Sequence, residues 1–398
     1  MSNPRAVRIS GPLTRYVDDF CDELAGQGYT PNTASLHLRL MAELSGWVAA
    51  EGLEGSDLTE ARVEEFFQAR RARGCQVLVS RRSLVPLMVY LSGLGVAPPL
   101  ASVATSDEVL VVAYRRHLVV ERGLAPCTVD RYLEVARWTS ARWEAQGRTL
   151  DAVSAGEVSA LVLDECRQRN AGSVKALVTG LRSWLRFLAG EGVMSHDLAG
   201  AVPAVASWRG GWVPRGLSES EVAAVLAAVD TTSRAGLRDR AVLVMLARLG
   251  LRCAEVAALT LDDVDWRQGE IVVRGKGGHS DRLPLVVDVG EALAAYVRDG
   301  RPKVASRAVF VKAQAPLVAL TADGVGGIVA CAGRRAGVRA SAHRLRHSAA
   351  TAMLRGGASL GEIGQILRHA DAATTAIYAK VDYRALRTLA PSWPGRTA

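Results

Sequence analysis

Two stretches of this chain, about 95 residues apart, share one pattern of glycine, proline and apolar residues, and this repetition constrains the fold more than any other feature. GQGYTPNTASLHLRLMAELSGW at 26–47 parallels ERGLAPCTVDRYLEVARWTSARW at 121–143, so the Gly-x-x-Pro-x-Thr pattern at Gly28 recurs at Gly123. SDLTEARVEEF and SLVPLMVYLSGLGV likewise have later counterparts in DAVSAGEVSALV and GLRSWLRFLAGEGV. Apolar spacings of three and four predict amphipathic helices. A duplicated unit of about four helices is the simplest interpretation, and two ordinary bundles with similar helix starts are the alternative.

The 398 residues, 49% of them hydrophobic, are enough for two or three domains, each with its own core. The segment GAVPAVASWRGGWVPRG, rich in glycine and proline, indicates a linker. We therefore predict an N-terminal helical domain, a second helical domain, the linker and a C-terminal domain, with boundaries at 1–104, 105–205, 206–217 and 218–398.

The C-terminal domain is predicted to combine helices with a small β-sheet. Ser218 and Glu221 form a capping box, which places helices near 218–230 and 237–249. β-rich runs at 270–275 and 282–287 flank a glycine-containing turn, and a third strand is expected at 307–312. The predicted fold class is mainly α with a small sheet, a helical lobe preceding a mixed α/β domain.

Charge is distributed unevenly along the chain, whose net charge is +9. Residues 201–398 hold 27 Lys and Arg against 17 Asp and Glu, whereas residues 1–200 hold 22 against 23. The C-terminal half therefore carries the whole positive excess. A basic half fits a polyanionic partner, although many arginine-rich proteins are basic without binding nucleic acid.

The sequence argues against a membrane protein and against a metal or disulfide framework. Its apolar stretch AVLVMLARLGL is too short to span a bilayer and carries Arg248, and the first residues lack an apolar signal region. Six cysteines are scattered without a CxxC pair, so we expect reduced thiols and neither zinc nor disulfides. We expect a cytoplasmic protein.

A cluster of basic residues followed by a tyrosine carries the chemistry. In the run His343-Arg344-Leu345-Arg346-His347, a helix would place His343 and Arg346 on one face, and Tyr378 follows 32 residues after Arg346. A tyrosine hydroxyl can act as a nucleophile toward an anion that these residues bind. Zinc binding by His343 and His347 is a poor alternative because no third ligand is evident.

Two upstream motifs complete the set. GLRCAEVAAL contains Arg252 with Glu255 three residues later, and VVRGKGGHSDRLPL places Lys276 between glycines at a turn that a polyanionic ligand could approach closely. Planar guanidinium groups suit a phosphate because each can bond two oxygens. Glu255 is expected to orient its helix by a hydrogen bond, with a surface ion pair as the alternative.

The ordered set Arg, Lys, His-x-x-Arg, His, Tyr closely resembles the catalytic signature of the tyrosine recombinases, the family that includes phage integrases. The resemblance covers roughly residues 106–390 and implies a site-specific DNA recombinase that works through a 3′-phosphotyrosyl intermediate. Its catalytic residues would be Arg252, Lys276, His343, Arg346, His369 and Tyr378.

The resemblance also implies a role for each residue. The arginines would bind the phosphate, Lys276 would protonate the leaving oxygen, and His343 would handle protons. His369 would hydrogen-bond the phosphate, whereas we expect His347 to pack or to orient its helix. This sequence departs from the family in having Arg368 where a glycine often precedes the second histidine, and His279 in place of a frequent basic residue.

The implied partners are double-stranded DNA with specific recombination sites and three further copies of the chain in a homotetramer. Accessory DNA-bending or directionality proteins would be additional partners. No membrane is implied. No cofactor or metal is implied either, because transesterification conserves the energy of the broken bond. Two rivals remain: a type IB topoisomerase, which would relax DNA without joining different duplexes, and a non-catalytic DNA-binding regulator. Retention of every expected catalytic residue type argues against the regulator.

Overall fold

The protein divides into two compact units. The helical unit comprises residues 43–211, and the split unit combines residues 1–42 with 212–398. Within the described chain, no helix is long and apolar enough to cross a membrane. The domain boundaries predicted from the sequence remain predictions. This computed structural model describes residues 4–78, 80–98, 106–205, 216–275, 280–368, 374–375 and 378.

Both predicted repeats fold as helices, with corresponding elements in the same order. The first repeat contains α1 (Val17–Gly26), α2 (Pro31–Ala50), α3 (Glu60–Ala72) and α4 (Arg81–Gly93). The second contains α5 (Ser106–Arg116), α6 (Pro126–Glu144), α7 (Ala155–Gln168) and α8 (Ala171–Gly190).

Local sequence explains where these helices begin. Gly28 and Gly123 have φ angles of 84° and 57°, a left-handed conformation that favours glycine, and each precedes a helix that begins at a proline. Thr59 caps α3 and Ser154 caps α7 by accepting a hydrogen bond from the third residue of the helix. The repeated sequence pattern therefore corresponds to repeated helix starts.

Aromatic side chains form much of the core around α5 and α8. The rings of Tyr114 and Trp184 have centroids 4.8 Å apart, and Phe187 packs against both. Offset aromatic contacts at such distances stabilise a core beyond the area that they bury. This core therefore ties the first and last helices of the second repeat together.

The C-terminal part of the split unit is mainly α with one small sheet, which confirms the predicted fold class. Its elements are α9 (Glu219–Ala227), α10 (Arg234–Leu249), α11 (Cys253–Ala257), β1 (Val264–Asp265), β2 (Glu270–Arg274), β3 (Ser280–Pro284), α12 (Val287–Ala295), α13 (Ala322–Arg335), α14 (Ala342–Arg355) and α15 (Leu360–Ile366).

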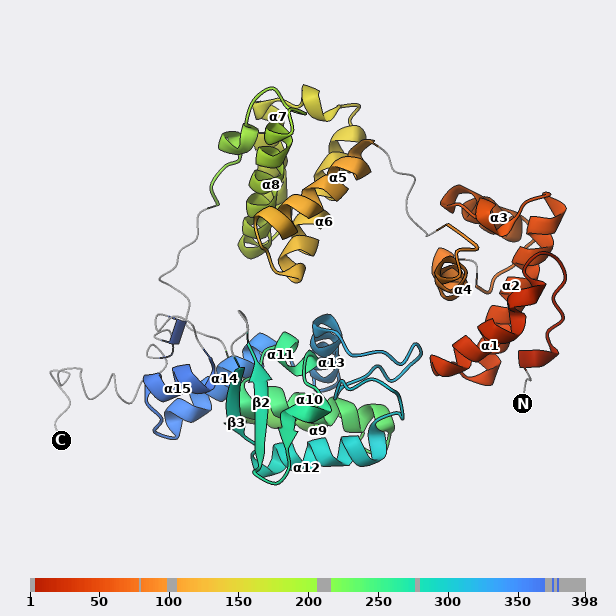
Figure 1. Ribbon diagram of the computed structural model, residues 1–398. Coiled ribbons are helices and arrows are strands. Elements are labelled where there is room, and N and C mark those ends of the chain that lie inside the picture. The colour runs from red at the N-terminus through yellow and green to blue at the C-terminus, as the bar shows by residue number, and fades with distance from the viewer. Residues whose placement is uncertain are drawn as a thin grey trace, which may run out of the picture. The chain divides into compact units, whose positions relative to one another are not determined.

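Helix α10 is the centre of this part. Seven consecutive residues from Ala241 to Ala247 are buried, as expected for a helix that is apolar on every side. The helix contacts α9, α12, α13 and α14 (Figure 1). It ends at Gly250, whose φ is 59°, and a side chain there would lie 2.5 Å from Leu367. The positive φ favours glycine at this turn, after which Leu251 enters the hydrophobic core and Arg252 precedes α11.

The sheet is antiparallel in the order β1-β2-β3, with Ile271 paired to Leu283 and Val264 to Ile271. The predicted strands at 270–275 and 282–287 correspond to β2 and β3, but the third strand expected at 307–312 is wrong. That segment forms only isolated bridges. The guanidinium of Arg301 donates hydrogen bonds to the carbonyls of Ala308 and Val309 in this segment. Those carbonyls therefore do not pair with a neighbouring strand.

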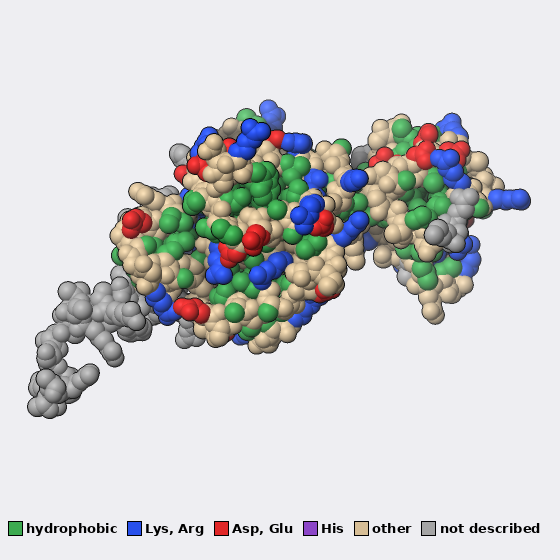
Figure 2. All heavy atoms as spheres, turned by 90° about the horizontal axis from the view of Figure 1, so that it is seen from below, with side chains coloured by type: hydrophobic (Ala, Val, Ile, Leu, Met, Phe, Trp, Pro, Cys, Tyr) green, Lys and Arg blue, Asp and Glu red, His purple; other side chains and the backbone are tan. Residues whose placement is uncertain are grey.

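Basic and acidic side chains are interspersed on the face of the molecule seen in Figure 2, rather than gathered by sign. Ion pairs account for part of this arrangement, including Arg248 with Asp288 and Arg307 with Asp262. Arginines paired in this way contribute little net field. The positive excess of the C-terminal half therefore comes from other arginines, which either share one carboxylate with a second arginine or have no carboxylate partner among the described residues.

Candidate active site

Arg252 stands at the start of α11, directly after the turn at Gly250, and is anchored by Glu255. Its backbone N–H donates to Glu255 Oε2 at 2.8 Å, and its Nη1 donates to Oε1 at 2.7 Å. The Glu255 side chain is 3% exposed, whereas that of Arg252 is 41% exposed. Glu255 is thus a buried anchor and not half of a surface ion pair, and the guanidinium of Arg252 remains accessible.

Arg368 shares the same carboxylate from the far side of the site. Its Nη2 donates to Glu255 Oε2 at 2.6 Å, and its side chain is 5% exposed. Its φ is 55°, the left-handed conformation in which a glycine would be unstrained. The arginine therefore occupies a glycine-like backbone position, and its ion pair offsets the strain.

Arg368 also touches Arg252 directly, because its carbonyl accepts a hydrogen bond from Arg252 Nη2 at 3.4 Å. Burial raises the pKa of Glu255, but hydrogen bonds from the Arg252 backbone and the Arg368 guanidinium outweigh burial and hold that pKa below its ordinary value. Glu255 is therefore ionised at neutral pH.

Helix α14 presents His343, Arg346 and His347. Ser341 caps the helix by accepting from the N–H of Arg344. Arg346 is buried, and its two terminal nitrogens donate to the carbonyls of Gly250 and Leu367. Burial, and next the charge of Arg252, lower the pKa of Arg346 to about 10, so it stays protonated at neutral pH.

Tyr378 lies beside α14 with its side chain 1% exposed, packed in a cluster with Ala350, Ile363 and Leu367. Its hydroxyl is 2.8 Å from His347 Nδ1, and His347 Nε2 is 2.9 Å from His343 Nε2. Burial raises the pKa of Tyr378 despite the opposing charge of Arg346. The tyrosine is therefore a neutral phenol at neutral pH.

The charges of this cluster suit a phosphate. Arg252 and Arg368 bind the carboxylate of Glu255, whereas Arg346 is influenced by its charge without bonding to it, so these four groups keep a positive excess. Burial, and then the charges of Arg346 and Arg252, lower the pKa of His343, so this imidazole is neutral at neutral pH. A buried excess of fixed positive charge is what an anionic transition state needs.

The structure brings together four of the six predicted catalytic residues. Arg252, His343, Arg346 and Tyr378 lie in one cluster of hydrogen bonds and mutual electrostatic influence. Lys276 and His369 lie outside the described residues, as does Tyr383, the tyrosine five residues after Tyr378 that is the rival for the role of nucleophile. Among the residues that the structure describes, no three His, Cys, Asp or Glu side chains are grouped to hold a metal ion.

Sequence reasoning missed two features of this site. His347 was expected to pack or to orient its helix, whereas it contacts the hydroxyl of Tyr378. Arg368 was noted only as a departure from glycine, whereas it holds Glu255. The signal for His347 was its position four residues after His343 on the same helix face. No local signal could pair Arg368 with a carboxylate 113 residues away.

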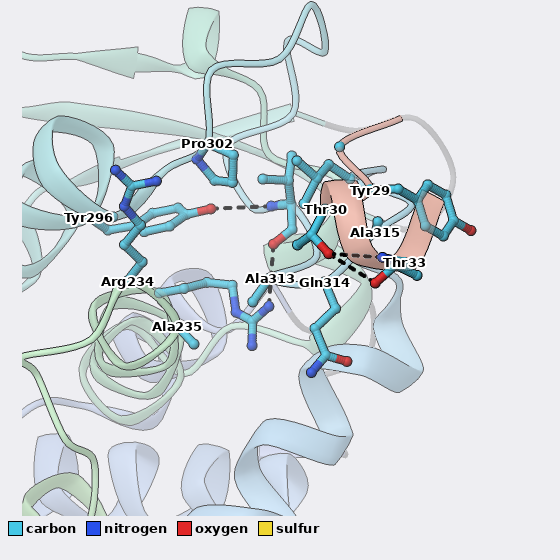
Figure 3. A pocket seen from close by; sticks show the side chains of 15 residues that line it. Tyr29, Thr30, Thr33, Arg234, Ala235, Tyr296, Pro302, Ala313, Gln314 and Ala315 are labelled. Carbon is cyan, nitrogen blue, oxygen red and sulfur yellow. Dashed lines mark hydrogen bonds between the residues drawn. The ribbon is translucent and has the colours of Figure 1, made fainter. Parts of the chain in front are cut away.

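A separate pocket of the split unit is drawn in Figure 3. The hydroxyl of Tyr296 accepts from the N–H of Val311 at 3.3 Å, and Arg238 donates to the carbonyl of Val311 at 3.4 Å. Arg252, His343, Arg346 and Tyr378 are not among the residues that line this pocket. Its lining includes Tyr29, Thr30, Arg234, Tyr296 and Gln314.

The chain is similar to known integrases and recombinases. The profile of the phage integrase family matches residues 215–385. The putative integrase/recombinase y4rA of Sinorhizobium fredii is 38% identical over 393 residues, covering 97% of this chain and 95% of that protein. Tyrosine recombinase XerD of Mycobacterium tuberculosis is 35% identical over 303 residues, covering 71% of this chain and 95% of XerD.

A solved structure extends the comparison to the fold. The XerH site-specific recombinase bound to its palindromic difH substrate superposes with a TM-score of 0.54 at 15% identity, over 82% of this chain and 93% of that one. The relatives that share more than 30% of their residues with this chain show that the protein is a site-specific DNA recombinase. The chain belongs to the phage integrase family of tyrosine recombinases. Neither a type IB topoisomerase nor a non-catalytic regulator is favoured.

Proposed function

We propose that this recombinase cleaves duplex DNA at specific recombination sites with the hydroxyl of Tyr378 as its nucleophile. The observation that carries the proposal is the placement of that hydroxyl, hydrogen-bonded to His347 on the helix that also carries Arg346. The phenolic oxygen forms a bond to phosphorus as the bond from phosphorus to the 5′ oxygen breaks. The product is a 3′-phosphotyrosyl enzyme and a free 5′-hydroxyl strand end.

The arginines stabilise the transition state of this step. A phosphodiester gains negative charge on its nonbridging oxygens as the nucleophile arrives, and Arg252 and Arg346 supply fixed charge to meet it. Two terminal N–H groups of Arg346 are used by the carbonyls of Gly250 and Leu367, which leaves the second N–H on each nitrogen for phosphate.

Lys276 and His369 complete the proposed machinery by family resemblance. Lys276, between two glycines, protonates the departing 5′ oxygen. His369 donates a hydrogen bond to a phosphate oxygen. His343 takes part in moving the proton of the tyrosine. These roles need neither ATP nor a metal, because each cleaved bond is replaced by a bond of similar energy.

Rejoining reverses the same chemistry with a different strand. A 5′-hydroxyl from a second duplex attacks the phosphotyrosyl bond, and Tyr378 leaves as the free phenol. Recombination cuts two strands in each of two duplexes, so four tyrosines are required, and we propose a homotetramer on DNA. Accessory DNA-bending or directionality proteins would assist its assembly. The outcome is integration, excision or transposition.

A nicked duplex that loses its 5′ fragment after cleavage traps the covalent intermediate and tests this proposal. Tyr378→Phe removes only the hydroxyl and is expected to abolish the covalent adduct while leaving DNA binding within about twofold of the unchanged protein. Adduct is measured by denaturing gel with labelled DNA, and binding by mobility shift.

Tyr383→Phe is the matched control and is expected to form adduct at the normal rate. An adduct that persists in Tyr378→Phe, with Tyr383→Phe inactive, would assign the nucleophile to the wrong tyrosine. Joining of two separately labelled duplexes, rather than relaxation alone, is the expected product of the unchanged enzyme.

A further inference from the structure

Three side chains form a continuous line of hydrogen bonds that ends at the proposed nucleophile. The hydroxyl of Tyr378 bonds to His347 Nδ1 at 2.8 Å, and His347 Nε2 lies 2.9 Å from His343 Nε2. The two imidazoles meet edge to face with centroids 4.2 Å apart, and His347 and Tyr378 do so at 5.5 Å. His347 is thus the described group that links the nucleophile to the remaining histidine.

The hydrogen-bond pattern allows His347 to accept a proton. Of two facing Nε2 atoms, one must carry the hydrogen and the other must accept it. When His347 carries the hydrogen on Nε2, its Nδ1 bears a lone pair directed at the tyrosine hydroxyl. The phenol then donates to His347, and His347 donates to His343.

We propose that His347 is a catalytic residue that takes the proton of Tyr378 during DNA cleavage, with His343 accepting a hydrogen bond from the resulting imidazolium. This inference rests on the proposed role of Tyr378 as the nucleophile. As the phenolic oxygen bonds to phosphorus, its O–H bond breaks and the proton moves to His347 Nδ1. The 5′ oxygen leaves with a proton from Lys276. In rejoining, His347 returns its proton to the departing phenol.

The burial of the tyrosine supports this route. A side chain that is 1% exposed has little access to water, which favours a protein group as the acceptor of its proton. Burial also raises the pKa of Tyr378, and the phenol therefore does not ionise unaided at neutral pH. A neighbouring base is needed at the hydroxyl, and His347 is in contact with it.

The charges around the two histidines make proton transfer depend on substrate. Arg346 lies on α14, the helix that carries both histidines. Arg252 and Glu255, at the start of α11 and within it, and Arg368, after α15, face Arg346. Burial, and then the charges of Arg346 and Arg252, lower the pKa of His343. A bound DNA phosphate offsets that charge, so His347 becomes a more effective base when DNA is present.

The test compares His347→Gln with the unchanged enzyme in single-turnover adduct formation on the nicked duplex, as a function of pH. Glutamine can still hydrogen-bond the hydroxyl but cannot take its proton. We expect a loss of roughly 100-fold or more near neutral pH, the size of a general-base contribution. We also expect the rate of the variant to keep rising toward alkaline pH, whereas that of the unchanged enzyme levels off above the imidazole range.

A second measurement separates a base from a positioning residue. Replacing Tyr378 with a fluorinated tyrosine, whose phenol ionises more readily, should accelerate His347→Gln much more than it accelerates the unchanged enzyme. Added imidazole should partly restore His347→Ala. His196→Gln, an exposed histidine in the helical unit, is the matched control and should leave rate and pH profile unaltered.

Two outcomes would overturn the inference. One is a His347→Gln enzyme, folded by thermal melting and binding DNA normally, that cleaves at the rate of the unchanged enzyme. The other is a slow variant that keeps the original pH profile and gains nothing from the fluorinated tyrosine, which would make His347 a positioning residue. Tyr378→Phe is assayed alongside: if it still forms adduct, the proposed nucleophile fails, and otherwise only the role of His347 is at stake.

Discussion

Two arginines of the site, Arg346 and Arg252, are held in opposite ways. Arg346 is buried at 5% exposure, and both of its described hydrogen bonds go to backbone carbonyls. Arg252 is 41% exposed and is paired with the carboxylate of Glu255. Carbonyls fix a guanidinium without neutralising it, whereas a carboxylate at 2.7 Å cancels much of its field.

This difference indicates a division of labour between the two sides of the site. Arg346 offers a full charge in a place with little water, where electrostatic interactions are strongest. Arg252 offers an accessible group whose orientation is set by Glu255 and Arg368. We therefore expect Arg346 to contribute most to the transition state, and the Glu255 side to contribute more to geometry and stability.

Replacing each arginine tests this comparison, and the largest effect is expected at Arg346. Arg346→Ala should slow adduct formation by roughly 100- to 1,000-fold, as for loss of a preorganised charge contact. Arg252→Ala should slow it by a smaller factor, roughly 100-fold. Single-turnover cleavage of the nicked duplex at saturating protein measures both.

Arg346→Ala also leaves the carbonyls of Gly250 and Leu367 without their partner, which costs about 1–3 kcal/mol for each group. Rates must therefore be compared on protein shown to be folded by circular dichroism. Arg346→Lys restores a charge without the planar fork and should recover only part of the rate. A larger loss at Arg252 than at Arg346 would reverse the proposed division of labour.

Glu255→Gln probes the other side and should mainly lower stability. The substitution leaves Arg368 buried without its carboxylate, and breaking a buried ion pair from one side typically costs about 3–5 kcal/mol. Cleavage by the folded fraction should fall by roughly 10-fold, because Arg252 loses its anchor. Urea unfolding gives the stability, and a variant as stable as the unchanged protein would show that the pair contributes nothing net.

The sequence was sufficient for the features that depend on local rules. Capping residues and apolar spacing predicted the helices, and β-rich runs around the glycine turn predicted β2 and β3. The motifs around Arg252, Arg346 and Tyr378 predicted which residues meet. Their roles in catalysis, like those of Lys276 and His369, remain predictions.

Features set by distant partners could not be predicted in the same way. The segment 307–312 has the composition of a strand, but two of its carbonyls accept hydrogen bonds from the guanidinium of Arg301. Arg368 has no local reason to face Glu255, and its left-handed backbone is visible only in three dimensions. Each of these outcomes depends on which hydrogen-bond partner the folded chain brings to a given group, and residue spacing does not encode that choice.

Arg368 combines strain with an ion pair, and two substitutions separate them. Arg368→Ala loses the pair and keeps a side chain at a φ of 55°, whereas Arg368→Gly loses the pair and relieves the strain. We expect the glycine variant to be more stable than the alanine variant by about 1 kcal/mol, measured by urea unfolding. An alanine variant more stable than the glycine variant would show that the left-handed backbone carries little strain, because glycine gains more conformational entropy on unfolding. Both variants should cleave roughly 10-fold more slowly if Arg368 helps to position Arg252 through Glu255.

The smallest expected effect is the response of this ion-pair cluster to acid. The pKa of Glu255 is below its ordinary value in the folded protein, so its ionised form stabilises the fold. That contribution is fully present above the unfolded pKa, near 4.5, and is lost as pH falls through the lower folded pKa. A protonated glutamate closely resembles glutamine, so the stability gap between the unchanged protein and Glu255→Gln should be constant at neutral pH and shrink in acid. Urea unfolding of both proteins from about pH 7 to about pH 3 measures the gap. A gap that persists unchanged at the acid end would mean that shape and packing, rather than the charge of Glu255, hold the Arg252 side of the site.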